Sequence, residues 1–144
     1  MNEHGFIRAV HRKLPDNIYR WKIHDTYAGG VPDAFYAGPA RCLFVEYKYL
    51  PRLPKRKTTT IKTSLSPNQK HWLDRMSSLD QFVAVVIGSP AASIILINGA
   101  WHSDITLYTF GKYATSADNI ATWITRTCTE QHNEYEEGIF SGCG

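Results

Sequence analysis

Cysteine is scarce in this chain of 144 residues, which contains three: Cys42, Cys128 and Cys143. They lie far apart and none belongs to a C-x-x-C pair, which argues against a disulfide framework and a structural zinc knuckle. Cys42 opens an apolar segment, so we expect it to be a small buried residue. The six histidines are scattered as well and form no tight cluster of the kind that binds zinc.

Long apolar runs are also missing. No stretch of about 18 apolar residues occurs, so the sequence predicts no transmembrane helix and no membrane partner. The N-terminus, Met1 to Gly5, lacks the charged-then-apolar pattern of a signal peptide, and we expect an intracellular, cytoplasmic protein. Hydrophobic residues make up 43% of the chain and charged residues 20%, which is the ordinary composition of one folded domain.

Charge of one sign does not dominate, because sixteen Lys and Arg against thirteen Asp and Glu leave a net charge of +3. Basic residues nevertheless gather between Lys48 and Lys62, where no acid interrupts them. Four glutamates gather at residues 130–137, where no Lys or Arg occurs. This separation predicts one surface that faces phosphate and another that is turned elsewhere.

Hydrophobic periodicity predicts a mixed order of helices and strands. We expect helices at residues 2–14, 67–79 and 115–131, and strands at residues 19–25, 31–37, 41–48, 81–88, 93–98 and 104–110. The whole chain is expected to form a single domain, with a core over about residues 2–98 and a C-terminal extension over about 99–131. We expect residues 132–144 to form a flexible tail.

Two of these elements carry sharper expectations about what is buried. In the first strand, Tyr19, Trp21 and Ile23 alternate with polar residues and are expected to form the buried face. In the last helix, which begins at a Thr115-x-x-Asp118 pattern typical of a capping box, Trp123 and Ile124 share one side. That side suits either the core or an interface with another chain.

The most informative spacing separates Asp33 from Glu46. Asp33 ends a Gly-Val-Pro-Asp turn, and Glu46 follows an apolar run two residues before Lys48. Side chains alternate along a strand, so Glu46 and Lys48 share a face while Tyr47 points to the other. Buried charges need partners, and a Glu46–Lys48 salt bridge is one explanation. The other is a Mg²⁺ site, in which Asp33 and Glu46 supply carboxylates and Lys48 faces a phosphate.

These residues resemble a known family. The segments Gly30-Val31-Pro32-Asp33, Leu43 to Lys48 and Leu65 to Leu73 occur in the order typical of the PD-(D/E)xK nuclease superfamily. They look most like its virus-type replication-repair nuclease branch (VRR-NUC), and the resemblance spans about residues 3–98. It implies an α/β fold with a restriction-endonuclease-like αβββαβ core, in which helices flank a mixed central sheet. The helix near 115–131 would be an extra C-terminal helix.

The resemblance also implies roles for individual residues. Asp33 and Glu46 would hold Mg²⁺ or Mn²⁺, and the backbone carbonyl of Tyr47 would be a further ligand. Lys48 would either activate the attacking water or offset charge on the phosphorane, and the sequence leaves both roles open. The implied activity is metal-dependent hydrolysis of phosphodiester bonds in DNA.

Two further residues have both a structural and a functional explanation. Glu3 stands in the first turn of a helix, where an acid interacts favourably with the helix dipole, but the resemblance implies that it joins the active site and, with it, the metal. Gln69 completes a capping box with Ser66, whereas the resemblance implies a catalytic position beside the metal-bound water or phosphate. We favour the second explanation for Gln69, because Ser66 can cap the helix alone.

The connection at residues 51–64 contains two prolines, three consecutive threonines and five basic residues. Such a long connection is either a solvated flexible loop or a functional segment, and we favour an arm that grips phosphate and is ordered only on nucleic acid. Two basic residues of the N-terminal helix add to the expected DNA-binding set, which comprises Arg52, Lys55, Arg56, Lys57, Lys62, Arg8 and Arg12.

Substrate and assembly are expectations from the same resemblance. Stand-alone VRR-NUC proteins of viruses and bacteria look like homodimers, and a dimer would suit branched DNA such as a Holliday junction or a flap, because two-fold related sites can cut symmetric strands. The chain would then be a phage-type or mobile-element nuclease. A non-catalytic nucleic-acid-binding module and a factor that acts on a host protein are the alternatives, and the intact Asp33, Glu46 and Lys48 favour the nuclease.

Overall fold

The computed structural model describes residues 1–24, 29–130 and 139–142. Most of the acidic segment at 130–137 lies outside the described residues, and so do Asp25 and Cys143. Residues 139–142 of the tail expected to be flexible are described, and Ile139–Ser141 differ from that expectation because they form a strand paired with residues 95–97. None of the described helices is both long and apolar enough to span a bilayer.

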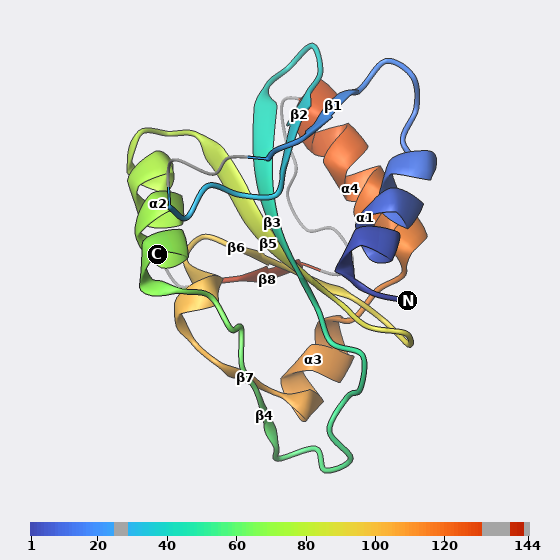
Figure 1. The fold of residues 1–144 in the computed structure, drawn as a ribbon, viewed down its shortest axis with the longest axis vertical. Coiled ribbons are helices and arrows are strands. Elements are labelled where there is room, and N and C mark those ends of the chain that lie inside the picture. Colours follow the sequence, from blue (N-terminus) through green and yellow to red (C-terminus); the bar gives the residue numbers. More distant parts are fainter. Residues whose placement is uncertain (25–28, 131–138, 143–144) are drawn as a thin grey trace.

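A mixed sheet of six strands forms the centre of the molecule (Figure 1). In spatial order its strands are β1 (Tyr19–Lys22), β2 (Ala34–Ala37), β3 (Cys42–Tyr49), β5 (Phe82–Gly88), β6 (Ile94–Ile97) and β8 (Ile139–Ser141). The first three strands are antiparallel neighbours, and β3 then pairs in parallel with β5. The β5–β6 pair is antiparallel and the β6–β8 pair is parallel.

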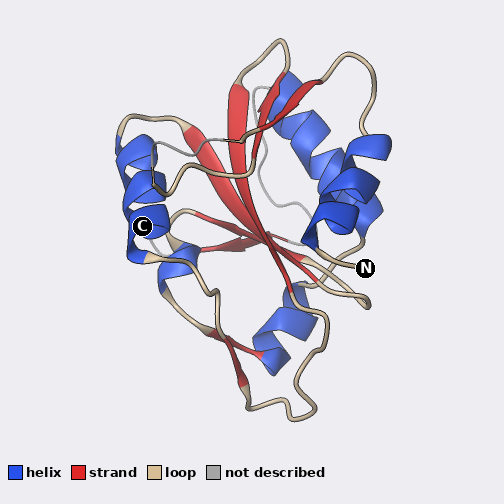
Figure 2. Ribbon diagram, viewed as in Figure 1, coloured by secondary structure: helices blue, strands red, loops and turns tan. Residues whose placement is uncertain are grey.

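Helices cover both faces of this sheet (Figure 2). On one face, α1 (Glu3–Arg12) and α4 (Ala117–Thr129) pack together over β2 and β3 in a shared core. On the other face, Leu73 of α2 (Pro67–Ser78) packs against Val83, Val85 and Ile87 of β5. The order α1, β1, β2, β3, α2, β5 is the expected αβββαβ order, and the expected mixed α/β architecture is confirmed.

A small second sheet lies below the end of β3 in Figure 1. It pairs β4 (Thr60–Ile61) with β7 (Ile105–Thr106), and the 3-10 turn η1 (Ala100–His102) precedes it while α3 (Leu107–Tyr113) follows it. The expected strand at residues 104–110 was therefore wrong beyond Thr106. The Thr106 hydroxyl accepts a hydrogen bond from the Thr109 amide and caps α3, so the chain turns helical at that point.

The first strand and Cys42 also differ from expectation. Tyr19 and Trp21 are 60% and 51% exposed, because β1 is an edge strand and its Trp21 face is not covered by a helix. The opposite face is anchored instead, where Arg20 donates hydrogen bonds to the carbonyls of His11 and Pro15. Cys42 is exposed because it lies beside the β2–β3 turn and faces away from Leu43, which is buried.

The C-terminal helix resolves an alternative that the sequence left open. Trp123 and Ile124 are 4% and 0% exposed and belong to the core between α1, α4 and the sheet, so their side of α4 is no free interface. The N-cap of this helix lies one residue later than expected. Ser116, and not Thr115, is its N-cap, and the Ser116 hydroxyl accepts a hydrogen bond from the amide of Asn119.

Candidate active site

Asp33 lies in the bend immediately before β2, one residue short of the strand in which it was expected. Its carbonyl accepts a hydrogen bond from the Ile23 amide at 2.8 Å, which ties the bend to the end of β1. Gly30 has φ +86°, and a Cβ there would lie 2.4 Å from the carbonyl oxygen of Asn68. Only glycine therefore fits the approach of this turn to the start of α2.

Asp33 and Glu46 meet at the middle of β3. The Tyr47 amide donates a hydrogen bond to Asp33 Oδ2 at 2.9 Å, so the carboxylate of Asp33 is fastened to the strand that carries Glu46. Glu46 is 3% exposed. Burial, a side-chain hydrogen bond with Asp33 and the Asp33 charge together raise the pKa of Glu46 far above its usual range. Two carboxylates thus share one poorly solvated space.

Gln69 holds Glu46 from the start of α2. Its Nε2 donates to Glu46 Oε2 at 2.9 Å, while its Oε1 accepts a hydrogen bond from the Ser66 amide at 2.9 Å. The Ser66 hydroxyl completes the capping box, because it accepts a hydrogen bond from the backbone amide of Gln69. The two expected contacts of Gln69 are therefore made at once, one through each end of the same side-chain amide.

Glu3 reaches the same region from α1. Burial and then the charge of Asp33 raise the pKa of Glu3, and a side-chain hydrogen bond with Asp33 adds to this. Asn2 caps the helix, because its side chain accepts a hydrogen bond from the Gly5 amide. Glu3 is thereby left free of capping and lies with Asp33.

Lys48 stands beside these carboxylates and forms no salt bridge with any residue that the structure describes. Its charge lowers the pKa of both Glu46 and Glu3, although burial and Asp33 outweigh it. Among the described residues the salt bridges are Lys13–Asp118, His102–Asp74 and Arg126–Glu130, so the Glu46–Lys48 ion pair that would explain the motif structurally is not formed. Lys48 is half-buried and faces the same side of β3 as Glu46.

The Tyr47 side chain is held in the core on the opposite face of β3 from Glu46 and Lys48. Its phenol shares a 2.7 Å hydrogen bond with the Tyr36 hydroxyl, which in turn contacts His11 Nε2 at 2.7 Å. Burial raises the pKa of the Tyr36 phenol well above its usual value, so this phenol stays neutral. The contacts anchor β3 to β2 and α1 at the residue between Glu46 and Lys48.

The donor set fits a hard divalent cation. Mg²⁺ is often held by one or two carboxylates together with phosphate oxygens and water, and the Asp33–Glu46 pair supplies the carboxylates. In a strand the N–H and C=O of one residue point to the same edge, so the Tyr47 carbonyl lies on the Asp33 side, past the last β2–β3 pair. Within the described residues, no three His, Cys, Asp or Glu side chains form a closed metal cluster by themselves.

One cation near this site was not expected from the sequence. Lys22 of β1 lowers the pKa of Glu3 and contacts the Nδ1 atom of His4. Lys22 and Trp21 point to opposite faces of β1. Because the Trp21 face was expected to be the buried one, Lys22 was not expected to lie near the N-terminal helix. The signal was present in the strand pattern.

The expected DNA-binding residues are all exposed but are not gathered in one place. Arg8 and Arg12 lie on the outer side of α1. Arg52, Lys55, Arg56, Lys57 and Lys62 follow β3 on the connection to α2. That connection is anchored without nucleic acid, contrary to expectation, because Thr60 and Ile61 pair with Thr106 and Ile105 of β7.

The comparisons with known proteins reach as far as the fold. No family model matches the chain, and no curated protein does either. The structure is similar to Archaeoglobus fulgidus Hjc, a Holliday junction resolvase from an archaeal hyperthermophile, with a TM-score of 0.51. The match covers 83% of this chain and 96% of that one, at 14% sequence identity. The fold is restriction-endonuclease-like. At this identity the likeness shows the fold alone, and function rests on the site.

Proposed function

We propose that this protein is a Mg²⁺- or Mn²⁺-dependent DNA endonuclease of the PD-(D/E)xK superfamily, in its VRR-NUC branch. The observation that carries the proposal is the meeting of Asp33 with the buried Glu46 beside Lys48, whose charge acts on the Glu46 carboxyl. An arrangement that raises the pKa of a buried carboxyl so strongly is unfavourable for stability and is typical of functional sites.

Each residue has a role in phosphodiester hydrolysis. Asp33, Glu46 and the Tyr47 carbonyl would hold the divalent ion, which supplies polarisation of the phosphoryl oxygen and acidification of water. Lys48 places a positive charge where negative charge develops on the phosphate, or accepts the proton of the attacking water. Gln69 fixes the rotamer of Glu46 through its 2.9 Å hydrogen bond, and Glu3 sets the position of Asp33.

The substrate that we propose is branched DNA, such as a four-way junction or a flap. Similarity of the fold to a protein described as a Holliday junction resolvase supports this choice, and so does the separation of basic residues between α1 and the segment after β3. A homodimer belongs to the same proposal, because two-fold related sites suit the two symmetric strands of a junction. Its contact would not use Trp123 and Ile124, which are buried in the core.

The test is cleavage of labelled four-way junction, flap, single-stranded and plain duplex DNA, with Mg²⁺, Mn²⁺ or EDTA. Asp33→Ala is compared with the wild type, and Asp16→Ala, which removes an exposed aspartate in the turn between α1 and β1, is the matched control. We expect cutting that needs metal and Asp33 and is unaffected in Asp16→Ala, with branched DNA preferred.

The other outcomes are equally informative. Cutting that persists in Asp33→Ala would overturn the assignment of the site. Tight, salt-sensitive binding without cutting of any of the four DNAs would replace the enzyme with a non-catalytic nucleic-acid-binding module. Equal cutting of junction and plain duplex would leave the nuclease and remove the preference for branched DNA.

A further inference from the structure

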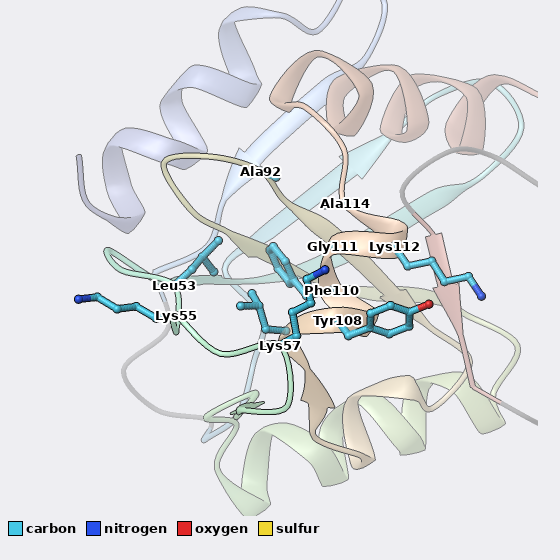
Figure 3. Close-up of a pocket in the computed structure, with 10 residues that line it drawn as sticks. Leu53, Lys55, Lys57, Ala92, Tyr108, Phe110, Gly111, Lys112 and Ala114 are labelled. Carbon is cyan, nitrogen blue, oxygen red and sulfur yellow. The ribbon is translucent and has the colours of Figure 1, made fainter.

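A pocket of about 660 Å³ opens between the segment after β3, the turn before β6 and helix α3 (Figure 3). Its apolar lining comes from Leu53, Ala92, Leu107, Phe110 and Ala114. Phe110 is 1% exposed and belongs to the second core cluster, so the floor of the pocket is part of the folded interior. The volume lies in the range of cavities that bind small organic groups.

Cations and one aromatic ring surround this apolar floor. Lys55, Lys57 and Lys112 line the pocket, and none of the acidic residues that the structure describes does. Figure 3 shows Lys55 and Lys112 extending from opposite sides of it. Tyr108 is 62% exposed, which is unusual for so large an aromatic side chain with apolar neighbours. We refer to these four residues and the apolar floor as the lysine-rimmed pocket.

The walls of the lysine-rimmed pocket are connected by backbone hydrogen bonds. The Tyr108 amide donates to the carbonyl of Lys57 at 3.0 Å, and the Leu107 amide donates to the carbonyl of Thr59 at 2.9 Å. On the opposite wall, Ser93 and Thr115 exchange two backbone hydrogen bonds of 2.8 and 2.7 Å, beside Ala92 and Ala114. The pocket therefore exists before any ligand arrives, which reduces the entropy lost on binding.

We propose that the lysine-rimmed pocket binds an unpaired nucleotide of a single-stranded DNA segment. Charge complementarity selects a polyanion, since the lining contains three lysines and, among the described residues, no acid. The apolar floor and the exposed Tyr108 ring require that this polyanion also carry a flat, largely apolar group. A nucleotide combines both, with its base stacked on Tyr108 and its flanking phosphates near Lys55, Lys57 and Lys112.

Paired bases do not fit this description, because in a duplex their faces are stacked on one another and are not available to Tyr108. The pocket would therefore select the unpaired or unstacked nucleotides that occur at flaps and at the centre of junctions. The chain reaches the pocket directly from the candidate active site, since β3 carries Glu46 and Lys48 and Leu53 follows its end. This inference rests on the proposed function in one respect, namely that the polyanion is DNA.

The experiment measures binding in EDTA, so it does not depend on cleavage. The probe is an oligothymidine strand of about 12 nucleotides with one 2-aminopurine, a fluorescent adenine analogue that is quenched by stacking; the matched probe is the same strand in a duplex. We expect the wild type to bind the single strand with quenching. Tyr108→Ala should lose the quenching and weaken this binding about 10-fold, since stacking on an aromatic ring is worth roughly 1–3 kcal/mol per base.

Three further variants serve as controls for the effect of Tyr108→Ala. Tyr108→Phe keeps the ring and is expected to bind like the wild type. Lys112→Gln is expected to keep the quenching and lower the salt slope of single-strand binding by about 0.7. Tyr19→Ala removes a tyrosine that is 60% exposed on the edge strand β1, which contributes no residue to the lining of the pocket. This variant should bind both probes like the wild type.

Three results would overturn the inference. They are unchanged single-strand binding in Tyr108→Ala, an equal loss of duplex binding in that variant, and an equal effect of Tyr19→Ala. Failure of the proposed nuclease looks different, because it shows in the metal and Asp33 dependence of cleavage. A protein without cleavage activity could still quench the 2-aminopurine probe through Tyr108, and an active nuclease could fail to do so.

Discussion

Carboxylates gather at the middle of β3, whereas lysines surround the apolar pocket beside α3. The two regions differ in how much burial they impose on charge: Glu46 is 3% exposed and its pKa is raised, while Lys55, Lys57 and Lys112 are all exposed. Like charges cost little in water and much when desolvated. The first region is therefore a site that needs a counter-ion, and the second is a surface that can wait for a polyanion.

The largest effect is expected from Lys48→Ala, which removes the lysine that shares the face of β3 with Glu46. Cleavage should fall at least about 100-fold, because a positioned proton acceptor or charge stabiliser contributes that much or more. Binding of junction DNA in EDTA should stay close to that of the wild type, and the circular dichroism spectrum should not change. Single-turnover cleavage and fluorescence anisotropy measure the two quantities separately.

Lys70→Ala is the matched control, since it removes a lysine of α2 next to Gln69 and leaves the carboxylates untouched. If Lys48→Ala cuts at the wild-type rate, Lys48 has no part in the chemistry. A loss of binding as large as the loss of cleavage would instead place Lys48 among the contacts to DNA.

The second expected effect is stabilisation by metal. A divalent ion between Asp33 and Glu46 offsets the repulsion that the pair carries, and ligand at a hundredfold excess over its Kd stabilises the native state by about 2.7 kcal/mol. For a chain of this size we expect Mg²⁺ or Mn²⁺ to raise the Tm by roughly 5 to 10 °C relative to EDTA. Differential scanning fluorimetry of the wild type and Asp33→Asn checks this, because the variant should show little increase.

The third prediction concerns pH in the absence of metal. The folded-state pKa of Glu46 is raised, so its contribution to stability is complete below the ordinary value of 4.5 and is lost as pH rises toward the raised value. The wild type in EDTA should therefore lose stability as pH increases above about 4.5, by at most about 1.4 kcal/mol per pH unit. Glu46→Gln keeps the shape, cannot ionise and should show a flatter dependence in urea unfolding.

Asp74→Asn is the comparison for the pH experiment. Asp74 accepts hydrogen bonds from Trp101 and His102 near the surface and takes no part in the contacts of Glu46. Its substitution should leave the slope between neutral and alkaline pH as it is in the wild type. A Glu46→Gln protein with the full wild-type slope would show that Glu46 is not the group that titrates.

The smallest effect is expected on the lysine side. Neutralising Lys55, Arg56 and Lys57 with glutamine should weaken duplex binding and lower the slope of log K against log salt by roughly 2 to 3, at about 0.9 per lost phosphate contact. Stability should hardly change, because all three side chains are exposed. A salt titration of anisotropy gives the slope, and urea unfolding gives the stability.

The matched variant neutralises Lys13, Arg75 and Arg126, which removes the same charge from other surfaces. An equal change of slope in both triple variants would mean that net charge, and no particular surface, attracts DNA. The lysines after β3 would then have no particular role in DNA binding, and only the carboxylate region would remain a distinct site.

The sequence was sufficient where local pattern and burial agree. The apolar run before Glu46 predicted β3 almost to the residue, and the Ser-Pro-x-Gln pattern predicted the start of α2. The two candidate ligands met as expected because an antiparallel β2–β3 pair brings the residue before β2 next to the middle of β3. The roles of these residues in cleavage stay predictions.

The sequence was insufficient where tertiary contacts decide. Tyr19 and Trp21 alternate as a buried face would, but β1 lies at the sheet edge, and sheet order is not visible in one strand. The segment after Thr106 has β-type residues, yet a threonine cap starts α3. The lysine-rimmed pocket was missed for the same reason, since Lys57 and Tyr108 are brought together by backbone hydrogen bonds between segments that are distant in the sequence.

The double hydrogen bonding of Gln69 has a consequence for anyone who redesigns this protein. One side-chain amide both starts α2 and orients Glu46, so the two properties cannot be adjusted independently. Gln69→Glu would retain an acceptor for the Ser66 amide but set a further carboxylate against Glu46. A stabilised helix start and a tunable orientation of Glu46 are thus alternatives at this position, and redesign of the proposed metal site is better begun from Glu3.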